Sequence, residues 1–253
     1  MNLGNGGFTI TSSFPNFGMY VSSAGDFNLD GKFDIVIRSF ARDSGTPFAT
    51  VINGTGNDDL AGMNVNADNI GTSEGVNFVG ALDDKTSNFK SCVTGGMDIN
   101  GDGADEIAVG LPFFNSGDQG LVFVIFGSKN GYPNAVMDVS DLGSAVFKGF
   151  RIAGAKNDYV GYSMSLGDTN HDGYADIALG SSIGTSIIGG NSHGYIIFGG
   201  EYLNDLYIDL SIGNSNGVTY QGIPNTGFGF SVSSGRDING DGIIDSIFWF
   251  PFS

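Results

Sequence analysis

The sequence has little of several features that mark common functional classes. It contains a single cysteine, Cys92, so neither an intrachain disulfide nor a cysteine-based metal cluster can form. Its 10 basic residues face 27 acidic ones, the formal net charge is −17, and no segment clusters Lys or Arg. Phosphate backbones and anionic membranes repel such a polyanion, so the composition predicts no nucleic-acid partner.

Long hydrophobic runs are missing as well. The longest apolar stretches, such as 121–126 and 247–252, are far shorter than the roughly 20 residues of a membrane-spanning helix. The N-terminus has no basic region followed by an apolar one, so no signal peptide is visible. We therefore expect no transmembrane segment in this chain, which either starts inside a longer protein or is not exported by that route.

The residues that are abundant favour a folded β protein. Apolar residues make up 40% of the chain, with 21 Phe and 9 Tyr, which is enough apolar surface to form a core. The 43 glycines show no Gly-X-Y period, which excludes a collagen-like chain.

An internal repeat of about 70 residues runs through the sequence. Four segments share Asp at position 1, Asn at 3, Asp at 5, Gly at 6 and an acid at 9. They begin at Asp26, Asp98, Asp168 and Asp237, so successive copies are 72, 70 and 69 residues apart. We interpret residues 1–253 as one domain whose repeats are approximately 7–75, 76–148, 149–216 and 217–253.

Each repeat predicts short β-strands, because runs of Val, Ile, Phe and Tyr alternate with Gly, Asn, Ser and Asp clusters. Strand A, which precedes each acidic loop, is expected at 20–25, 92–97, 162–167 and 231–236. Strand B follows the loop at 35–37, 107–109, 177–179 and 246–248. Strand C is expected at 48–52, 121–126 and 194–198, and strand D at 76–80, 149–154 and 218–222. Residues 7–10 match the D type.

The predicted fold is therefore all-β. Roughly four strands in each repeat are typical of propeller blades. The order of strands predicts three complete four-stranded blades and a partial fourth. We favour a fragment of a larger propeller, because the strand at 247–252 needs a neighbour on its edge. A self-closed four-bladed ring and a curved open array are the alternatives.

The four acidic loops predict calcium sites. Side-chain oxygens at alternate positions of a tight loop turn inward together, the glycine at position 6 permits the turn, and position 7 presents a carbonyl. Five or six oxygens with water suit Ca²⁺ better than Mg²⁺, so we expect up to four Ca²⁺. The predicted ligands are Asp26, Asn28, Asp30, Lys32 (carbonyl) and Asp34; Asp98, Asn100, Asp102, Ala104 (carbonyl) and Glu106; Asp168, Asn170, Asp172, Tyr174 (carbonyl) and Asp176; and Asp237, Asn239, Asp241, Ile243 (carbonyl) and Asp245.

Two other interpretations of these loops fit less well. An EF-hand needs a Glu at position 12, where this chain has Ile37, Val109, Leu179 and Phe248. An ordinary polar turn needs no carboxylate at position 9. Without a cation, three carboxylates so close together repel one another strongly.

Motifs around the loops resemble those of a known family. They are Phe17-Gly18 with Ser23–Asp26, Gly161–Asp168, Phe228–Asp237 and Ile107–Pro112. With these motifs the chain resembles the FG-GAP repeats of the integrin α-subunit β-propeller and its relatives. The resemblance spans essentially the whole chain, and it implies calcium binding by the A–B loops and a role in adhesion and recognition.

We found no convincing catalytic constellation. The string Gly213–Gly217 matches Gly-x-Ser-x-Gly, but it lies in a loop between two predicted strands, whereas a nucleophile elbow needs a helix after it. The two histidines, His171 and His193, have no plausible nucleophile and acid nearby in the pattern. The sequence therefore predicts a protein without enzymatic activity.

The predicted function is a calcium-binding module for adhesion or recognition that takes a protein or glycan ligand. Modest calcium affinity suits the cell surface or the extracellular space. The rest of a longer propeller, or a partner subunit, is a further expected contact. One alternative is a non-catalytic accessory domain of a larger secreted enzyme such as a hydrolase or lipase. Another is a degenerate repeat protein with no ligand beyond calcium.

Overall fold

The structure is a computed structural model that describes residues 7–40, 45–55, 64–80, 92–115, 118–129, 131–181, 192–223 and 226–250. The first eleven strands are β1 (Thr9–Thr11), β2 (Tyr20–Gly25), β3 (Asp34–Arg38), β4 (Ala49–Ile52), β5 (Asn64–Asn66), β6 (Gly75–Val79), β7 (Val93–Met97), β8 (Glu106–Leu111), β9 (Leu121–Ile125), β10 (Val136–Asp138) and β11 (Gly149–Ala153). The remaining strands are β12 (Ser163–Gly167), β13 (Asp176–Ser181), β14 (His193–Ile197), β15 (Tyr207–Asp209), β16 (Gly217–Gln221), β17 (Ser231–Arg236) and β18 (Asp245–Trp249).

The helical segments of the described part are all short 3-10 turns. They are η2 (Ala67–Asn69), η3 (Val139–Asp141), η4 (Glu201–Leu203) and η5 (Leu210–Ile212). None of these described helices has the length and hydrophobicity that crossing a membrane would require. The all-β prediction is confirmed.

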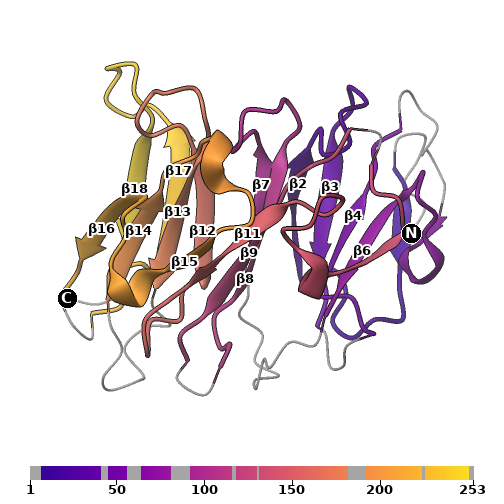
Figure 1. Ribbon diagram of the computed structural model, residues 1–253, viewed down its shortest axis with the longest axis horizontal. Coiled ribbons are helices and arrows are strands. Elements are labelled where there is room, and N and C mark those ends of the chain that lie inside the picture. Colours follow the sequence, from indigo (N-terminus) through magenta and orange to yellow (C-terminus); the bar gives the residue numbers. More distant parts are fainter. Residues whose placement is uncertain are drawn as a thin grey trace.

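The strands form a row of sheets in which sequence neighbours pair in antiparallel fashion (Figure 1). The sheets contain β2-β3-β4-β6, then β7-β8-β9-β11, then β12-β13-β14-β16, and finally the pair β17-β18. These are the predicted A, B, C and D strands, and their bounds agree with the prediction to within two residues. The sequence repeats begin with the D strand that closes the preceding sheet, since β6 pairs with β4.

A short additional strand in each repeat was missed by the sequence analysis. The strands β5, β10 and β15 lie between strands C and D, and each pairs in parallel with the D-type strand of the preceding unit, which is β1, β6 or β11. The first two complete sheets therefore contain five strands instead of four. Each short strand ends in an Asn or Asp that caps the following 3-10 turn. These parallel strand pairs join successive repeats at their outer edges.

The hydrophobic core lies between the sheets. In β8, Ile107 and Val109 pack in the cluster shared with the first sheet, whereas Ala108 packs in the cluster shared with the third. The strand β9 alternates in the same way, with Phe123 on one face and Val124 on the other. Successive side chains of a strand point to opposite faces of its sheet. Both faces are buried here, which explains why these strands are unbroken hydrophobic runs.

The sheets form an open row in this structure. The pair β1-β5 lies at one end of the row and β17-β18 at the other, near the labels N and C in Figure 1. Within the described residues, neither end pairs with the other. An open row is expected both of a fragment of a larger propeller and of a curved open array, and the number of blades stays a prediction.

Glycine allows two sheets to approach closely at Gly110 in β8. A Cβ at this position would overlap the carbonyl oxygen of Gly161, which precedes β12 in the next sheet. The contact is between backbone atoms on both sides, so a side chain cannot be accommodated by rotation.

We predict that Gly110→Ala destabilises the fold by about 2 kcal/mol, as expected for overpacking between rigid elements. Urea unfolding followed by fluorescence measures the loss. Gly71→Ala is the matched control, because its Cβ would meet only the flexible end of Glu74 at 3.4 Å. Equal stability of the two variants would contradict the close approach of the sheets.

Candidate metal centres in the hairpin loops

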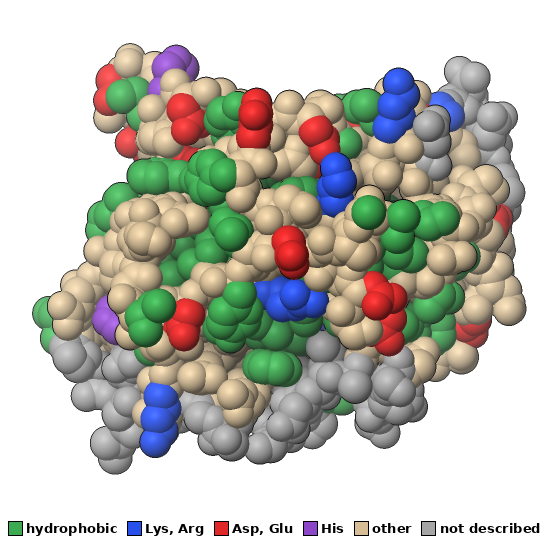
Figure 2. Space-filling model, viewed as in Figure 1, with side chains coloured by type: hydrophobic (Ala, Val, Ile, Leu, Met, Phe, Trp, Pro, Cys, Tyr) green, Lys and Arg blue, Asp and Glu red, His purple; other side chains and the backbone are tan. Residues whose placement is uncertain are grey.

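The four acidic loops lie along one edge of the row of sheets. They span 26–34, 98–106, 168–176 and 237–245 and join β2 to β3, β7 to β8, β12 to β13 and β17 to β18. These turns form the upper edge in Figure 1, and Figure 2 shows acidic side chains gathered along that edge. All the predicted ligand residues therefore lie on the same side of the molecule.

The loops are folded around their own side chains. In the third loop, the Asp168 carboxylate accepts the backbone N–H groups of Asp172 (3.1 Å) and Gly173 (3.0 Å). The Asn170 side chain also accepts from the Asp172 N–H (3.0 Å), and Asp172 Oδ1 accepts from the Tyr174 N–H (2.9 Å). Equivalent bonds recur in the other loops. The shared sequence pattern thus produces one shared loop conformation.

Two positions of each loop adopt a left-handed backbone conformation. The glycine at position 6 was predicted to do so, and its φ lies between +83° and +93° in the four loops. Position 4 is also left-handed, although its sequence varies: it is occupied by Leu29, Gly101, His171 and Gly240, with φ between +55° and +81°. His171 is exposed at the loop tip.

The acid at position 9 lies at the base of each loop. Asp34, Glu106 and Asp176 are almost completely buried. Asp34 accepts the N–H of Phe27 (3.0 Å) in its own loop and that of Gly54 (2.6 Å) just after β4. Asp176 accepts the N–H groups of Thr169 (2.8 Å) and Gly199 (3.0 Å) in the same way. Each of these two carboxylates therefore fastens the loop to the rest of its sheet.

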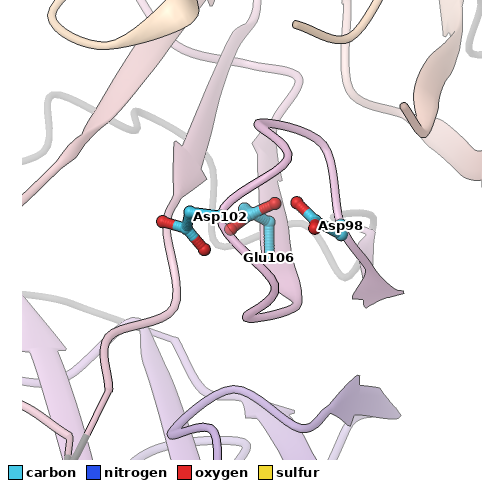
Figure 3. Close-up of side chains that lie close together, drawn as sticks. All are labelled: Asp98, Asp102 and Glu106. Carbon is cyan, nitrogen blue, oxygen red and sulfur yellow. The ribbon is translucent and has the colours of Figure 1, made fainter. Parts of the chain in front are cut away.

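The second loop brings three acids together. Ligand atoms of Asp98, Asp102 and Glu106 all lie within 4.8 Å of one another, and Figure 3 shows the three side chains side by side. Within the part of the chain that the structure describes, no other group of acids, His or Cys is this compact. Glu106 is one methylene longer than the Asp at position 9 of the other loops, which explains its reach.

Burial makes the charge of these acids costly. Burial, together with the charges of Asp102 and Asp98, raises the pKa of Glu106 to about 9. Burial likewise raises the pKa of Asp34 to about 6 and raises that of Asp176. The second loop therefore places the buried Glu106 carboxyl beside the more exposed Asp98 and Asp102 carboxylates, and a divalent cation would stabilise the charged form of Glu106.

The donor set of the second loop fits a hard cation. It consists of three carboxylates, the buried side-chain amide of Asn100 and the backbone carbonyl of Ala104. All of these offer oxygen atoms, which are the ligands that Ca²⁺ takes. The first loop differs because Lys32 Nζ lies 3.6 Å from Asp30 Oδ2 and partly neutralises it. Both of these side chains are partly exposed, so this ion pair contributes little stability.

Neighbouring loops are bonded to one another. Asp105, which the sequence analysis did not assign as a ligand, accepts the N–H of Asp26 (2.8 Å) through its side chain. Ala175 donates its N–H to the Asp98 carbonyl (2.8 Å). The feature of the sequence that could have indicated the first contact is Gly25, because a Cβ at this position would overlap the Asp105 carboxylate. The first three loops thus form a linked series across the sheets.

His193 belongs to a polar cluster on β14 that the sequence did not reveal. Its Nδ1 lies 3.1 Å from the buried Asp158 carboxylate, and Tyr195 donates its hydroxyl to the same carboxylate (2.7 Å). The Ser181 hydroxyl bonds the backbone of His193 instead of its ring. The string Gly213–Gly217 runs from the end of η5 to the first residue of β16, so its serine lies in a loop, as predicted.

Comparisons with known proteins agree with this geometry. The signature described as FG-GAP repeat matches residues 160–197, which include β12, the third acidic loop, β13 and β14. Integrin alpha-E of Mus musculus is 31% identical over 158 residues, which are 59% of this chain and 12% of the integrin. These matches confirm the FG-GAP resemblance, and residues 160–197 are the segment that matches the FG-GAP repeat signature.

Two further relatives differ in their printed names. Integrin alpha pat-2 of Caenorhabditis elegans is 32% identical over 100 residues, covering 39% of this chain and 8% of that protein. Phosphatidylinositol-glycan-specific phospholipase D of Rattus norvegicus is 28% identical over 113 residues, covering 43% of this chain and 13% of the phospholipase. The matched segments are thus a small part of each relative.

We predict that Gly101→Ala destabilises the fold more than Gly240→Ala does. Both glycines occupy position 4 with φ near +80°, so both substitutions cost about 1 kcal/mol for the left-handed backbone. Only at Gly101 would the new Cβ collide, with the ring of Tyr174 in the neighbouring loop. Differential scanning calorimetry should show a lower Tm for Gly101→Ala, and equal Tm values would contradict the contact between the loops.

Proposed function

We propose that this chain is a segment of a calcium-binding β-propeller and acts as a module for adhesion or recognition, without catalytic activity of its own. The observation that carries the proposal is the compact group of Asp98, Asp102 and Glu106 inside a loop conformation shared by all four hairpins. The open row of sheets is consistent with part of a larger ring.

Calcium has a structural role in this proposal. The acidic loops turn the chain between strands A and B, and the first three of them are hydrogen-bonded to one another. A cation in each loop would remove the repulsion between carboxylates and hold the hairpin ends together. Four Ca²⁺ would change the formal net charge from −17 to about −9.

The ligand is a protein or a glycan, bound by loops that the rigid hairpins support. The similarity to integrins favours recognition. Loops of this type hold calcium with dissociation constants on the order of 10⁻⁴–10⁻³ M in extracellular modules. We therefore place the protein at the cell surface or outside the cell.

A second candidate function is that of an accessory domain in a larger secreted enzyme. The similarity to phosphatidylinositol-glycan-specific phospholipase D favours it, since that protein is named as an enzyme and the match covers a small part of it. A catalytic domain encoded in the same reading frame would favour the accessory domain. A membrane anchor encoded in that reading frame would favour adhesion.

For the metal sites, we predict that calorimetric titration with Ca²⁺ shows up to four bound ions and that EGTA lowers the Tm. Glu106→Gln should lower the stoichiometry by about one, because it removes a ligand charge while its amide oxygen still accepts the Ile99 N–H. Asp141→Asn is the control, since Asp141 is exposed and lies outside the loops. Fewer than two bound ions, or equal effects of both substitutions, would refute this version of the proposal.

For recognition, we predict that the immobilised chain retains specific surface proteins or glycans in calcium buffer and releases them in EGTA. Glycan arrays and capture from extracellular fractions, each run with and without chelator, measure this. The Glu106→Gln variant should retain less than the Asp141→Asn control. Absence of any retained ligand would favour the degenerate repeat, which binds calcium alone.

A further inference from the structure

A cavity of about 600 Å³ lies on the same edge as the acidic loops, between the first and second of them. Its lining comes from four segments: the tip of the first loop at Leu29, the second loop at Asp102, the turn that follows β9, and the residues just before β11. Ligand cavities of proteins commonly have volumes of about 300–1,000 Å³. This cavity has therefore room for a molecule the size of a sugar.

The cavity is built on rigid parts of the core. The ring of Tyr132, which lines it, packs against Phe27, Phe78 and Phe147 at centroid distances of 5.5–5.9 Å. The Tyr132 hydroxyl donates to the Phe126 carbonyl, and Ser128 donates its N–H to the Phe27 carbonyl (2.9 Å). A preformed cavity of this kind needs little ordering when a ligand binds.

Two lysines line the cavity in a strongly acidic chain. The sequence contains six lysines, and Lys129 and Lys148 both border this one cavity. Both are exposed, and within the described residues neither forms an ion pair. Two unpaired ammonium groups at one cavity attract an anion, and Lys is a common binder of phosphate groups.

The apolar part of the lining includes a residue in a costly conformation. Leu29 occupies position 4 of the first loop with φ +55°, where the second and fourth loops have glycine. A leucine is disfavoured in the left-handed region, and such residues concentrate at functional sites. Together with Phe126 and Val146, Leu29 provides an apolar lining for the body of a ligand.

The cavity also touches the candidate metal centre. Asp102 lines it, and an adjoining smaller cavity of about 240 Å³ shares Asp102, Phe126 and Lys148 with it. A bare carboxylate here would repel an anionic ligand. A cation held by Asp98, Asp102 and Glu106 would remove that repulsion, so occupancy of the two sites should be linked.

From the cavity, its lysines and its apolar lining, we propose that this edge binds a sugar-sized organic anion. A phosphate or carboxylate group lies between Lys129 and Lys148, and the body of the ligand rests on Leu29, Phe126 and Val146. The dependence on calcium rests on the proposed function of the second loop.

The test is calorimetry on the calcium-saturated chain with four probes: glucose 6-phosphate, glucuronate, inorganic phosphate and neutral glucose. We expect one or both of the organic anions to bind and glucose to bind far more weakly. Lys148→Gln should weaken that binding by roughly tenfold, which is the loss expected for one charge-assisted contact. Lys156→Gln, an exposed lysine outside the cavity, should leave it unchanged. Circular dichroism checks the fold of each variant.

Several outcomes would overturn the inference. They are no binding of either organic anion, equal binding of glucose, inorganic phosphate binding as tightly as the organic anions, or equal effects of the two lysine substitutions. Glucose 6-phosphate and glucuronate distinguish a phosphate ligand from a carboxylate ligand. Calcium titration of the same samples keeps the two proposals apart: calcium binding without anion binding refutes the cavity alone, whereas absent calcium binding refutes the metal centre.

Discussion

The buried acid at the base of each of the first three hairpin loops is the interaction on which the other features of this edge depend. Asp34 and Asp176 bond the loop on one side and the end of the third strand on the other. Their position secures the hairpins, but it places negative charge where burial raises the pKa. Further acids at positions 1 and 5 add to the charge, so the residues that shape the loop also carry the negative charge that a bound cation would offset.

The links between repeats extend this local arrangement along the molecule. The sheets pack face to face through side chains that alternate along each strand, as in β8 and β9. The parallel strand pairs β6-β10 and β11-β15 join the sheets at their outer edges. At the acidic edge, hydrogen bonds of Asp105 and Ala175 connect one loop to the next. A cation bound in one loop would therefore stiffen its neighbours too, which suits a surface that presents ligand sites.

Much of this fold could be predicted from the sequence, because hydrophobic runs and Asp-Gly turns are local signals that recur four times. The short strands β5, β10 and β15 could not, since three residues carry no clear pattern and their partners lie in another repeat. The cross-loop role of Asp105 was missed because its partner, Asp26, lies in another repeat. The contact of Asp158 with His193 was missed because the two residues are 35 positions apart in the sequence. The sequence pattern also did not reveal the effect of side-chain length, because it treats Asp and Glu at position 9 alike. In the described residues, Glu106 is the only position-9 acid that joins a compact group of three acids.

Diffraction from crystals grown with calcium tests the central claim most directly. The account predicts an anomalous peak in the second loop, surrounded by oxygens of Asp98, Asp102 and Glu106 at about 2.3–2.6 Å, the distances typical of Ca²⁺. Well-defined loops in which the Asp98 and Asp102 carboxylates contact only water and backbone amides, with no peak between them, would contradict it.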